Sequence, residues 1–179
     1  MYFQVIKILL LFLMFSLLGC DKSVEPLERG KCEVEISGYL NKTYSGEAVF
    51  ENIPNGRGDK LFFLLLKISD KEKQSYSIVQ LHGSIPAIGN NKLNNFEQNE
   101  DTAISKLIGE YNDSEVEGIF KSTGGNVEIE VSNNSEIRGK TEFPAYENIA
   151  VGKGESIKAQ INVRAKFYAL EGNTGIIIN

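Results

Sequence analysis

The sequence predicts an all-β protein, an antiparallel β-sandwich or flattened barrel that follows a cleaved N-terminal signal segment. Three observations support this fold class. Apolar and polar residues alternate with a period of two in several segments, glycine and asparagine turns separate those segments, and most of them carry one polar side. Strand patterns that follow one another with no clear helical pattern between them favour an antiparallel architecture over an α/β fold.

The first nineteen residues have the pattern of an export signal and are not counted as part of the fold. Lys7 precedes an apolar run from residue 8 to residue 18, and the small residue Gly19 follows it. The run is shorter than the roughly 20 apolar residues that a membrane-spanning helix needs. We therefore expect residues 1–19 to be a signal peptide.

The end of this segment, Leu17-Leu18-Gly19-Cys20, resembles the lipobox of bacterial lipoproteins. The resemblance implies that Leu17, Leu18 and Gly19 are recognised by the lipoprotein signal peptidase and that Cys20 becomes the acylated first residue. Two or three acyl chains, such as palmitate, would anchor the chain stably. The expected location is the cell membrane or the outer membrane, with the domain facing the periplasm or the exterior.

Residues 20–31 are polar, contain proline and glycine, and indicate a flexible tether. Residues 32–179 have the length of a single domain. The whole chain carries 19 basic and 24 acidic residues, for a formal net charge of −5, and no basic cluster. We therefore expect membrane contact through the lipid anchor and no nucleic-acid partner.

Alternation from Cys32 to Leu40 predicts the first strand, and Tyr44 to Ile53 predicts the second. In the segment Leu61 to Ile68, both the odd and the even positions carry apolar residues, which favours a central strand covered on both faces. Residues 76–81 should pair with it as a hairpin. Further strands are expected at 118–121, 126–131, 137–143 and 157–169, joined by turns at Ser122-Thr123-Gly124-Gly125, at Asn133-Asn134 and around Gly152 and Gly154.

The stretch from residue 82 to 118 is the least regular, and a short helix or an irregular loop fits it equally well. Around it, the order of elements, with Gly124-Gly125-Asn126-Val127 and Ile137-Arg138-Gly139-Lys140, resembles that of small β-sandwich lipoproteins of unknown function from Gram-negative bacteria. The resemblance spans roughly residues 32–169. It implies the location and the fold, and it carries over no catalytic residues.

The sequence offers no convincing set of catalytic or metal-binding residues. His82 is the single histidine, and no Gly-x-Ser-x-Gly motif accompanies it. One histidine and Cys32 cannot supply a typical zinc site. The acidic group Glu110, Asp113, Glu115 and Glu117 lacks the spacing of a calcium loop. We expect no enzyme activity, no metal and no cofactor, and we interpret Cys32 as a small apolar residue at the start of a strand.

Three functions remain open. The leading hypothesis is a non-enzymatic envelope lipoprotein that presents its loops to a protein or glycan partner. The second is an inhibitor or immunity-type lipoprotein, in which an acidic loop from Asn95 to Glu117 docks a basic toxin or envelope enzyme. The third is a carrier that holds small apolar ligands between its sheets.

Overall fold

The computed structural model describes residues 26–54, 60–68, 75–81, 85–95, 106–113, 116, 118–152 and 155–174. Within these ranges the chain forms ten strands and one strongly curled antiparallel sheet, so the all-β prediction is confirmed. The strands are β1 (Lys31–Gly38), β2 (Lys42–Pro54), β3 (Lys60–Lys67), β4 (Ser75–Leu81), β5 (Gly89–Lys92), β6 (Lys106–Asp113), β7 (Gly118–Ser122), β8 (Asn126–Ser132), β9 (Glu136–Gly152) and β10 (Glu155–Glu171).

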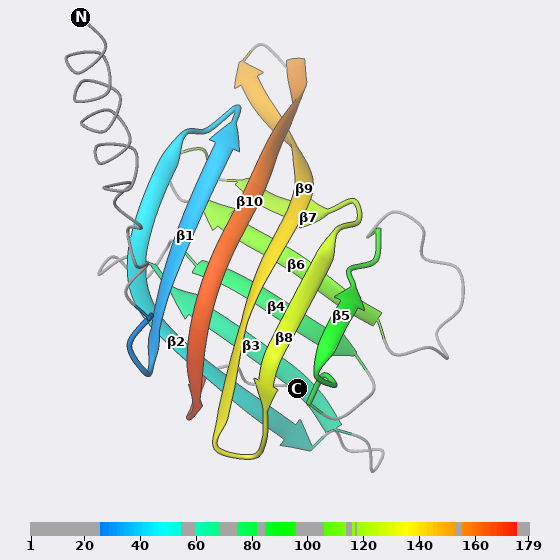
Figure 1. The fold of residues 1–179 in the computed structure, drawn as a ribbon. Coiled ribbons are helices and arrows are strands. Elements are labelled where there is room, and N and C mark those ends of the chain that lie inside the picture. The colour runs from blue at the N-terminus through cyan, green and yellow to red at the C-terminus, as the bar shows by residue number, and fades with distance from the viewer. Residues whose placement is uncertain are drawn as a thin grey trace, which may run out of the picture.

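The curled sheet folds into two layers in the form of a half-barrel (Figure 1). The front layer contains β1, β10, β9, β8 and β5, and the back layer contains β3, β4, β6 and β7. Two long strands connect the layers. The first part of β2 pairs with β1 and its second part with β3, while β9 pairs with β8 near its start and with β7 at Ala145 and Tyr146.

Period-two alternation sets the inner and outer sides of the front layer. In β1, Cys32, Val34 and Ile36 are buried, whereas the residues between them are exposed. The antiparallel register places Val34 opposite Ala165 of β10, which in turn lies opposite Thr141 of β9. Inward side chains therefore meet across neighbouring strands, because residues paired in register point to the same side of a sheet.

Large side chains fill the space between the two layers. The phenyl rings of Phe50 and Phe62 pack with their centroids 6.2 Å apart, and those of Tyr111 and Phe120 with centroids 6.1 Å apart. Burial of rings of this size is the main favourable contribution to the stability of such a domain. The largest fully buried side chains are those of Tyr111, Phe50, Phe62, Phe120, Phe143, Phe167, Ile36, Leu64, Leu66 and Leu93.

The turn predictions are confirmed where the structure describes them. The backbone φ angles of Gly124 and Gly125 are +142° and +110°, and these residues carry the chain from β7 in the back layer to β8 in the front layer. The side-chain oxygen of Asn133 accepts hydrogen bonds from the backbone N–H groups of Ser135 and Glu136 at 2.9 and 3.0 Å. This is the side-chain turn expected of an asparagine between two strands.

Within the stretch 82–118, the expectation of a helix or loop is wrong at residues 89–92 and 106–113, whereas residues 85–88 are irregular. Residues 89–92 form β5, and residues 106–113 form the eight-residue strand β6, which pairs with β4 and β7. In β6 the inward positions are occupied by Leu107, Gly109, Tyr111 and Asp113, so the alternation includes a glycine and a charged residue. Pairing with neighbouring strands overrides this weak local pattern.

The expectation for the segment 61–68 is corrected in one respect. β3 is central, with β2 on one side and β4 on the other, and the predicted hairpin with β4 is present. However, only its inner face is buried, at Phe62, Leu64 and Leu66. The outer residues Leu61 and Phe63, like Leu65, are half-buried.

The last hairpin is longer than expected. β9 continues past Phe143 to Gly152 and pairs with β10 along almost its whole length. The end of this hairpin extends beyond the other strands (Figure 1). Pro144 and the polar residues after it hide the continuation in the sequence, because they interrupt the apolar alternation.

Candidate functional site: a charged trough on the outer face of the front layer

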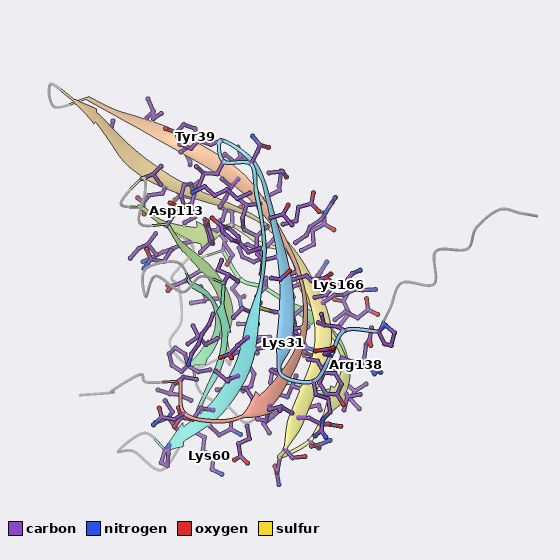
Figure 2. The ribbon with its side chains drawn as sticks, turned by 90° about the vertical axis from the view of Figure 1, so that its left-hand side faces the viewer. Lys31, Tyr39, Lys60, Asp113, Arg138 and Lys166 are labelled. Atoms are coloured by element: carbon purple, nitrogen blue, oxygen red, sulfur yellow. The ribbon has the colours of Figure 1, made fainter. Side chains whose placement is uncertain are left out.

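The outer face of the front layer is charged on four neighbouring strands. Most residues between the buried positions of β1, β10, β9 and β8 are exposed and point away from the core. Figure 2 shows Lys166 and Arg138 on this outer side. The outward charged residues include Glu33 and Glu35 of β1, Arg164 and Lys166 of β10, Arg138, Lys140 and Glu142 of β9, and Glu128 and Glu130 of β8.

A shallow trough of about 680 Å³ crosses this face. Its middle is lined by charged residues of β1, β10, β9 and β8, and its flanks by small polar residues. On one flank are Thr43 and Ser45 of β2, and on the other are Asn126 of β8 and Asn90 of β5. The trough therefore runs across the strands, from β2 to β5.

The register arranges the charges of the trough in two rows. One row reads Glu33, Lys166, Lys140 and Glu128 across β1, β10, β9 and β8. The two lysines lie directly opposite each other, a placement that costs free energy because like charges repel. The neighbouring row reads Glu35, Arg164 and Glu142, with the signs alternating.

Two cross-strand ion pairs hold part of this charge in place. The Lys140 ammonium lies 2.9 Å from the Glu128 carboxylate, and the Arg164 guanidinium lies 2.9 Å from that of Glu142. Hydrogen bonding to these carboxylates raises the pKa of both cations. Because all four side chains are well exposed, water screens both ion pairs, and they contribute little to stability. The charges thus remain available to a ligand.

The start of the domain is bound at one end of the same face. The backbone N–H of Gly30 donates to the carbonyl of Tyr168 at 2.7 Å, and the Arg29 guanidinium lies 3.2 Å from the carboxylate of Glu136. The guanidinium groups of Arg29 and Arg138 both lie over the Tyr168 ring, 5.9 and 5.8 Å from its centroid. The described chain therefore begins beside the face that carries the trough.

A second polar cluster lies inside the fold, between the start of β2 and the end of β6. The carboxylate of Asp113, which is fully buried, is 2.8 Å from the Lys42 ammonium and accepts a hydrogen bond from the Tyr111 hydroxyl at 2.7 Å. Burial, together with hydrogen bonds to Tyr44 and Asp113, raises the pKa of Tyr111. A cluster that is buried and internally paired in this way joins the two layers rather than facing a ligand.

The residues predicted from the sequence to matter for function do not meet in one place. Leu17, Leu18, Gly19 and Cys20 lie outside the described residues, as do His82, Glu115 and Glu117. Asp113 points inward and Glu110 outward, so these two acids cannot share a ligand. No group of three or more histidine, cysteine or acidic residues that could hold a metal ion occurs in the described part of the chain.

Cys32 lies at the second position of β1 with 1% of its surface exposed, and its thiol is 3.4 Å from the carbonyl oxygen of Glu47. Burial raises the pKa of this thiol to about 12. A thiol that keeps its proton is a poor nucleophile, which agrees with the interpretation as a small core residue. Within the described ranges, none of the chain forms a helix of the length and hydropathy needed to span a bilayer.

The trough was not predicted from the sequence, although the polar side of each strand was. The missing information is the order of strands. β1 lies beside β10, and β9 lies between β10 and β8, so the alternating charges of distant segments combine on one face. A search for outward charges of opposite sign at matching positions of the strand segments 32–37, 126–131, 137–143 and 157–169 could have suggested it.

Comparison with protein-family models, with curated proteins and with solved structures finds no match to this chain. The class of the protein is therefore defined by its own fold and site. It is an all-β domain built on one curled antiparallel sheet, with a polar trough of mixed charge on the outer face of that sheet.

Proposed function

We propose that this protein is a membrane-anchored lipoprotein of the bacterial envelope, acylated on Cys20, and that its β-domain is a non-enzymatic binding module. The trough on the outer face of the front layer is the single observation that carries the proposal. It combines a sizeable concave surface, exposed charges of both signs and a position beside the start of the domain. Binding sites are commonly concave surfaces with a few converging polar groups.

The chemistry of the trough favours a polypeptide partner over a neutral glycan. Rows of acidic and basic side chains complement a surface or an extended segment that carries both charges, and such complementarity gives specificity. Sugar rings are usually bound by stacking on exposed aromatic rings. Tyr44 is the single aromatic residue among those that line the trough, and its side chain packs against the core and hydrogen-bonds to Tyr111 inside the sheet.

The two other hypotheses find less support. The inhibitor hypothesis required an acidic loop from Asn95 to Glu117, but residues 106–113 of that stretch form β6, and Asp113 is buried against Lys42. The carrier hypothesis required an apolar space between the layers. That space is occupied in the described structure by buried rings such as Phe50, Phe143 and Phe167.

The anchor is tested by the intact mass and detergent partitioning of the natively expressed protein, beside the variant Cys20→Ala. We expect the native protein to have the mass of the chain from residue 20 plus its acyl groups and to enter the detergent phase. The variant should do neither. An uncut or unmodified native chain would refute the anchor and leave the trough untouched.

The trough is tested by site-specific photocrosslinking in intact cells. A photoreactive amino acid replaces Ser45 at the flank of the trough, or Asn134 in the exposed turn after β8 as a control. We expect a discrete protein adduct at position 45 only. The adduct should be lost when Lys166→Glu is added and kept when Lys60→Glu is added, because Lys60 is an exposed lysine outside the trough. Equal adducts at both positions, or insensitivity to Lys166→Glu, would contradict the proposal.

A further inference from the structure

The trough on the front layer runs between two rows of outward side chains. One row includes Glu33 and Lys140, and the other includes Glu35 and Arg164. The residue between the rows on each strand, such as Val34 of β1, is buried on the inner side of the sheet. The rows are two residues apart along each strand, which is about 6.8 Å. The sheet itself therefore forms the floor of the trough, and charged side chains form its walls.

The backbone of this floor is already hydrogen-bonded on both sides. β1 pairs with β2 and β10, β10 also pairs with β9, and β9 pairs with β8. β5 pairs with the other edge of β8 from Asn126 to Ile129. A partner therefore cannot join the floor as an additional strand, which is how extended peptides bind to a free sheet edge. It has to be recognised by the side chains of the two rows.

The sign of the charge changes along the trough. On β1, both charged residues that line it, Glu33 and Glu35, are acidic. In the middle, on β10 and β9, three of the four charged residues are basic, and on β8 the charged residue is the acidic Glu128. The four middle residues are Lys140, Glu142, Arg164 and Lys166. From β1 to β8, the trough is therefore negative, then positive, then negative.

The ion pairs inside the trough leave this pattern in place. They join Lys140 to Glu128 and Arg164 to Glu142, and all four side chains are exposed, so they can turn to a ligand at little cost. Lys166 forms no ion pair within the described part of the chain, and its register neighbour on β9 is the cation Lys140. An anion placed between these two strands would relieve the repulsion of the two lysines.

We propose that the trough binds an extended segment of the partner polypeptide in which a basic, an acidic and a second basic residue occupy three alternate positions. The segment lies across the strands, with its first basic residue over β1, its acidic residue between β10 and β9, and its second basic residue over β8. This inference rests on the proposed function, because it takes the partner to be a polypeptide that binds in the trough. Charge complementarity of this kind determines which partners are accepted.

The spacing of the strands fits alternate residues of an extended chain. Neighbouring strands lie about 4.8 Å apart, so β1 is about 7 Å from the line midway between β10 and β9, and that line is about 7 Å from β8. Side chains on one side of an extended segment repeat about every 6.8 Å. An α-helix fits less well, because its turns repeat every 5.4 Å, and its charges would fall out of step with the trough.

The test compares the binding of two synthetic peptides of equal composition to the full chain. In Thr-Lys-Thr-Glu-Thr-Lys-Thr the charges occupy alternate positions. In Thr-Thr-Lys-Glu-Lys-Thr-Thr they are adjacent, so the acid and the two bases project on opposite sides of an extended backbone. The anisotropy of a fluorophore at the N-terminus reports binding. We expect the alternating peptide to bind at least about threefold more tightly at low ionic strength, and added salt to reduce this difference.

A double-mutant cycle locates the acidic residue of the peptide. Lys166→Gln in the protein and glutamine in place of the glutamate in the alternating peptide should each weaken binding about twofold to fivefold. Together they should weaken it by less than the product of the two effects, because both changes remove the same contact. Lys60→Gln is the matched control, at an exposed lysine outside the trough, and it should leave the affinity unchanged.

Equal affinity for the two peptides would overturn the proposed pattern, because the trough would then respond to net charge alone. A cycle in which the two effects simply multiply would also overturn it, as would a failure of both peptides to bind. None of these results would remove the protein adduct at position 45, so the trough would remain the binding site of a partner of another kind. Absence of that adduct would instead refute the binding function itself.

Discussion

The carboxylate of Asp113 and the ammonium of Lys42 meet at 2.8 Å inside the fold, although 71 residues separate them in the sequence. Asp113 is fully buried, whereas the Lys42 side chain keeps 19% of its surface exposed. The pair joins the start of β2 to the end of β6, and thereby links the two layers. Its two partners are unequal, because only the lysine can reach water.

This inequality predicts an asymmetric response to mutation. Lys42→Met leaves a buried carboxylate without its cation and should lower the free energy of unfolding by about 3 to 5 kcal/mol. Asp113→Asn leaves a lysine that can turn towards solvent, and it should cost less. Denaturant unfolding followed by fluorescence or circular dichroism measures both.

The double variant Lys42→Met with Asp113→Leu is the control for this asymmetry. Replacing both charges removes the need to bury an unpaired ion, so the double variant should be more stable than Lys42→Met alone. A double variant that loses as much as the sum of the two single changes would show that the pair is not coupled.

Burial of the Cys32 thiol predicts a loss of stability at high pH. Burial raises the pKa of this thiol from 9.0 to about 12. Above pH 9 the unfolded chain releases the thiol proton while the folded chain keeps it, so stability falls as the pH rises, and the fall continues up to the folded pKa. The slope should approach about 1.4 kcal/mol per pH unit.

The free energy of unfolding measured at a series of pH values from 8 to 10 tests the contribution of the Cys32 thiol. The raised pKa of Tyr111 lowers the stability in a similar way, but only above pH 10. Cys32→Ala should be less stable at pH 8, since it leaves a small cavity, but its stability should change less between pH 8 and 10. Parallel curves for the two proteins would show that the thiol does not cause the decline.

The turn between β7 and β8 offers a matched pair of glycine substitutions. A side-chain carbon at Gly125 would lie 2.5 Å from both the carbonyl oxygen of Glu142 and the Cβ atom of Phe143, whereas at Gly124 nothing lies within 4 Å. Both residues have positive φ, so alanine is strained at either. Gly124→Ala should cost about 1 to 2 kcal/mol, and Gly125→Ala at least about 3 kcal/mol. Equal melting temperatures would exclude the steric contact with β9.

The all-β class and most of the strands could be predicted from the sequence because burial imposes a period of two wherever one face of a strand is covered. The segments at Cys32–Leu40 and 157–169 show this clearly, since apolar and polar residues strictly alternate there. β6 could not be predicted in this way. Its inward positions include Gly109, where a side-chain carbon would lie 2.9 Å from the Phe143 ring, and Asp113, which is paired with Lys42.

The candidate site depends on the order of the strands, which local alternation does not contain. Glu33, Lys140 and Lys166 are separate polar positions in the sequence, and only the pairing of β1 with β10 and of β10 with β9 sets them in one row. Long-range pairings of this kind are decided by the packing of the whole core. A single sequence therefore predicts which side chains face solvent but not which of them are neighbours.

The end of the β9–β10 hairpin should open more readily than the rest of both strands. On one side, β1 pairs with β10 only from Ile161 onwards, and on the other, β7 pairs with β9 only at Ala145 and Tyr146. In the described structure, the ribbon beyond these points is held by its own hairpin pairing, and a two-stranded ribbon is marginally stable in water.

Hydrogen exchange followed by mass spectrometry measures this difference along the two strands. Backbone amides of residues 147–152 and 155–158 should exchange at least about tenfold faster than those of residues 161–167, which pair with β1 and β9 on both sides. Partner binding in the trough should slow exchange around Lys140 and Lys166 and leave the hairpin end unchanged. Protection of the hairpin end in the isolated domain, equal to that of the central strands, would mean that another part of the chain pairs with it.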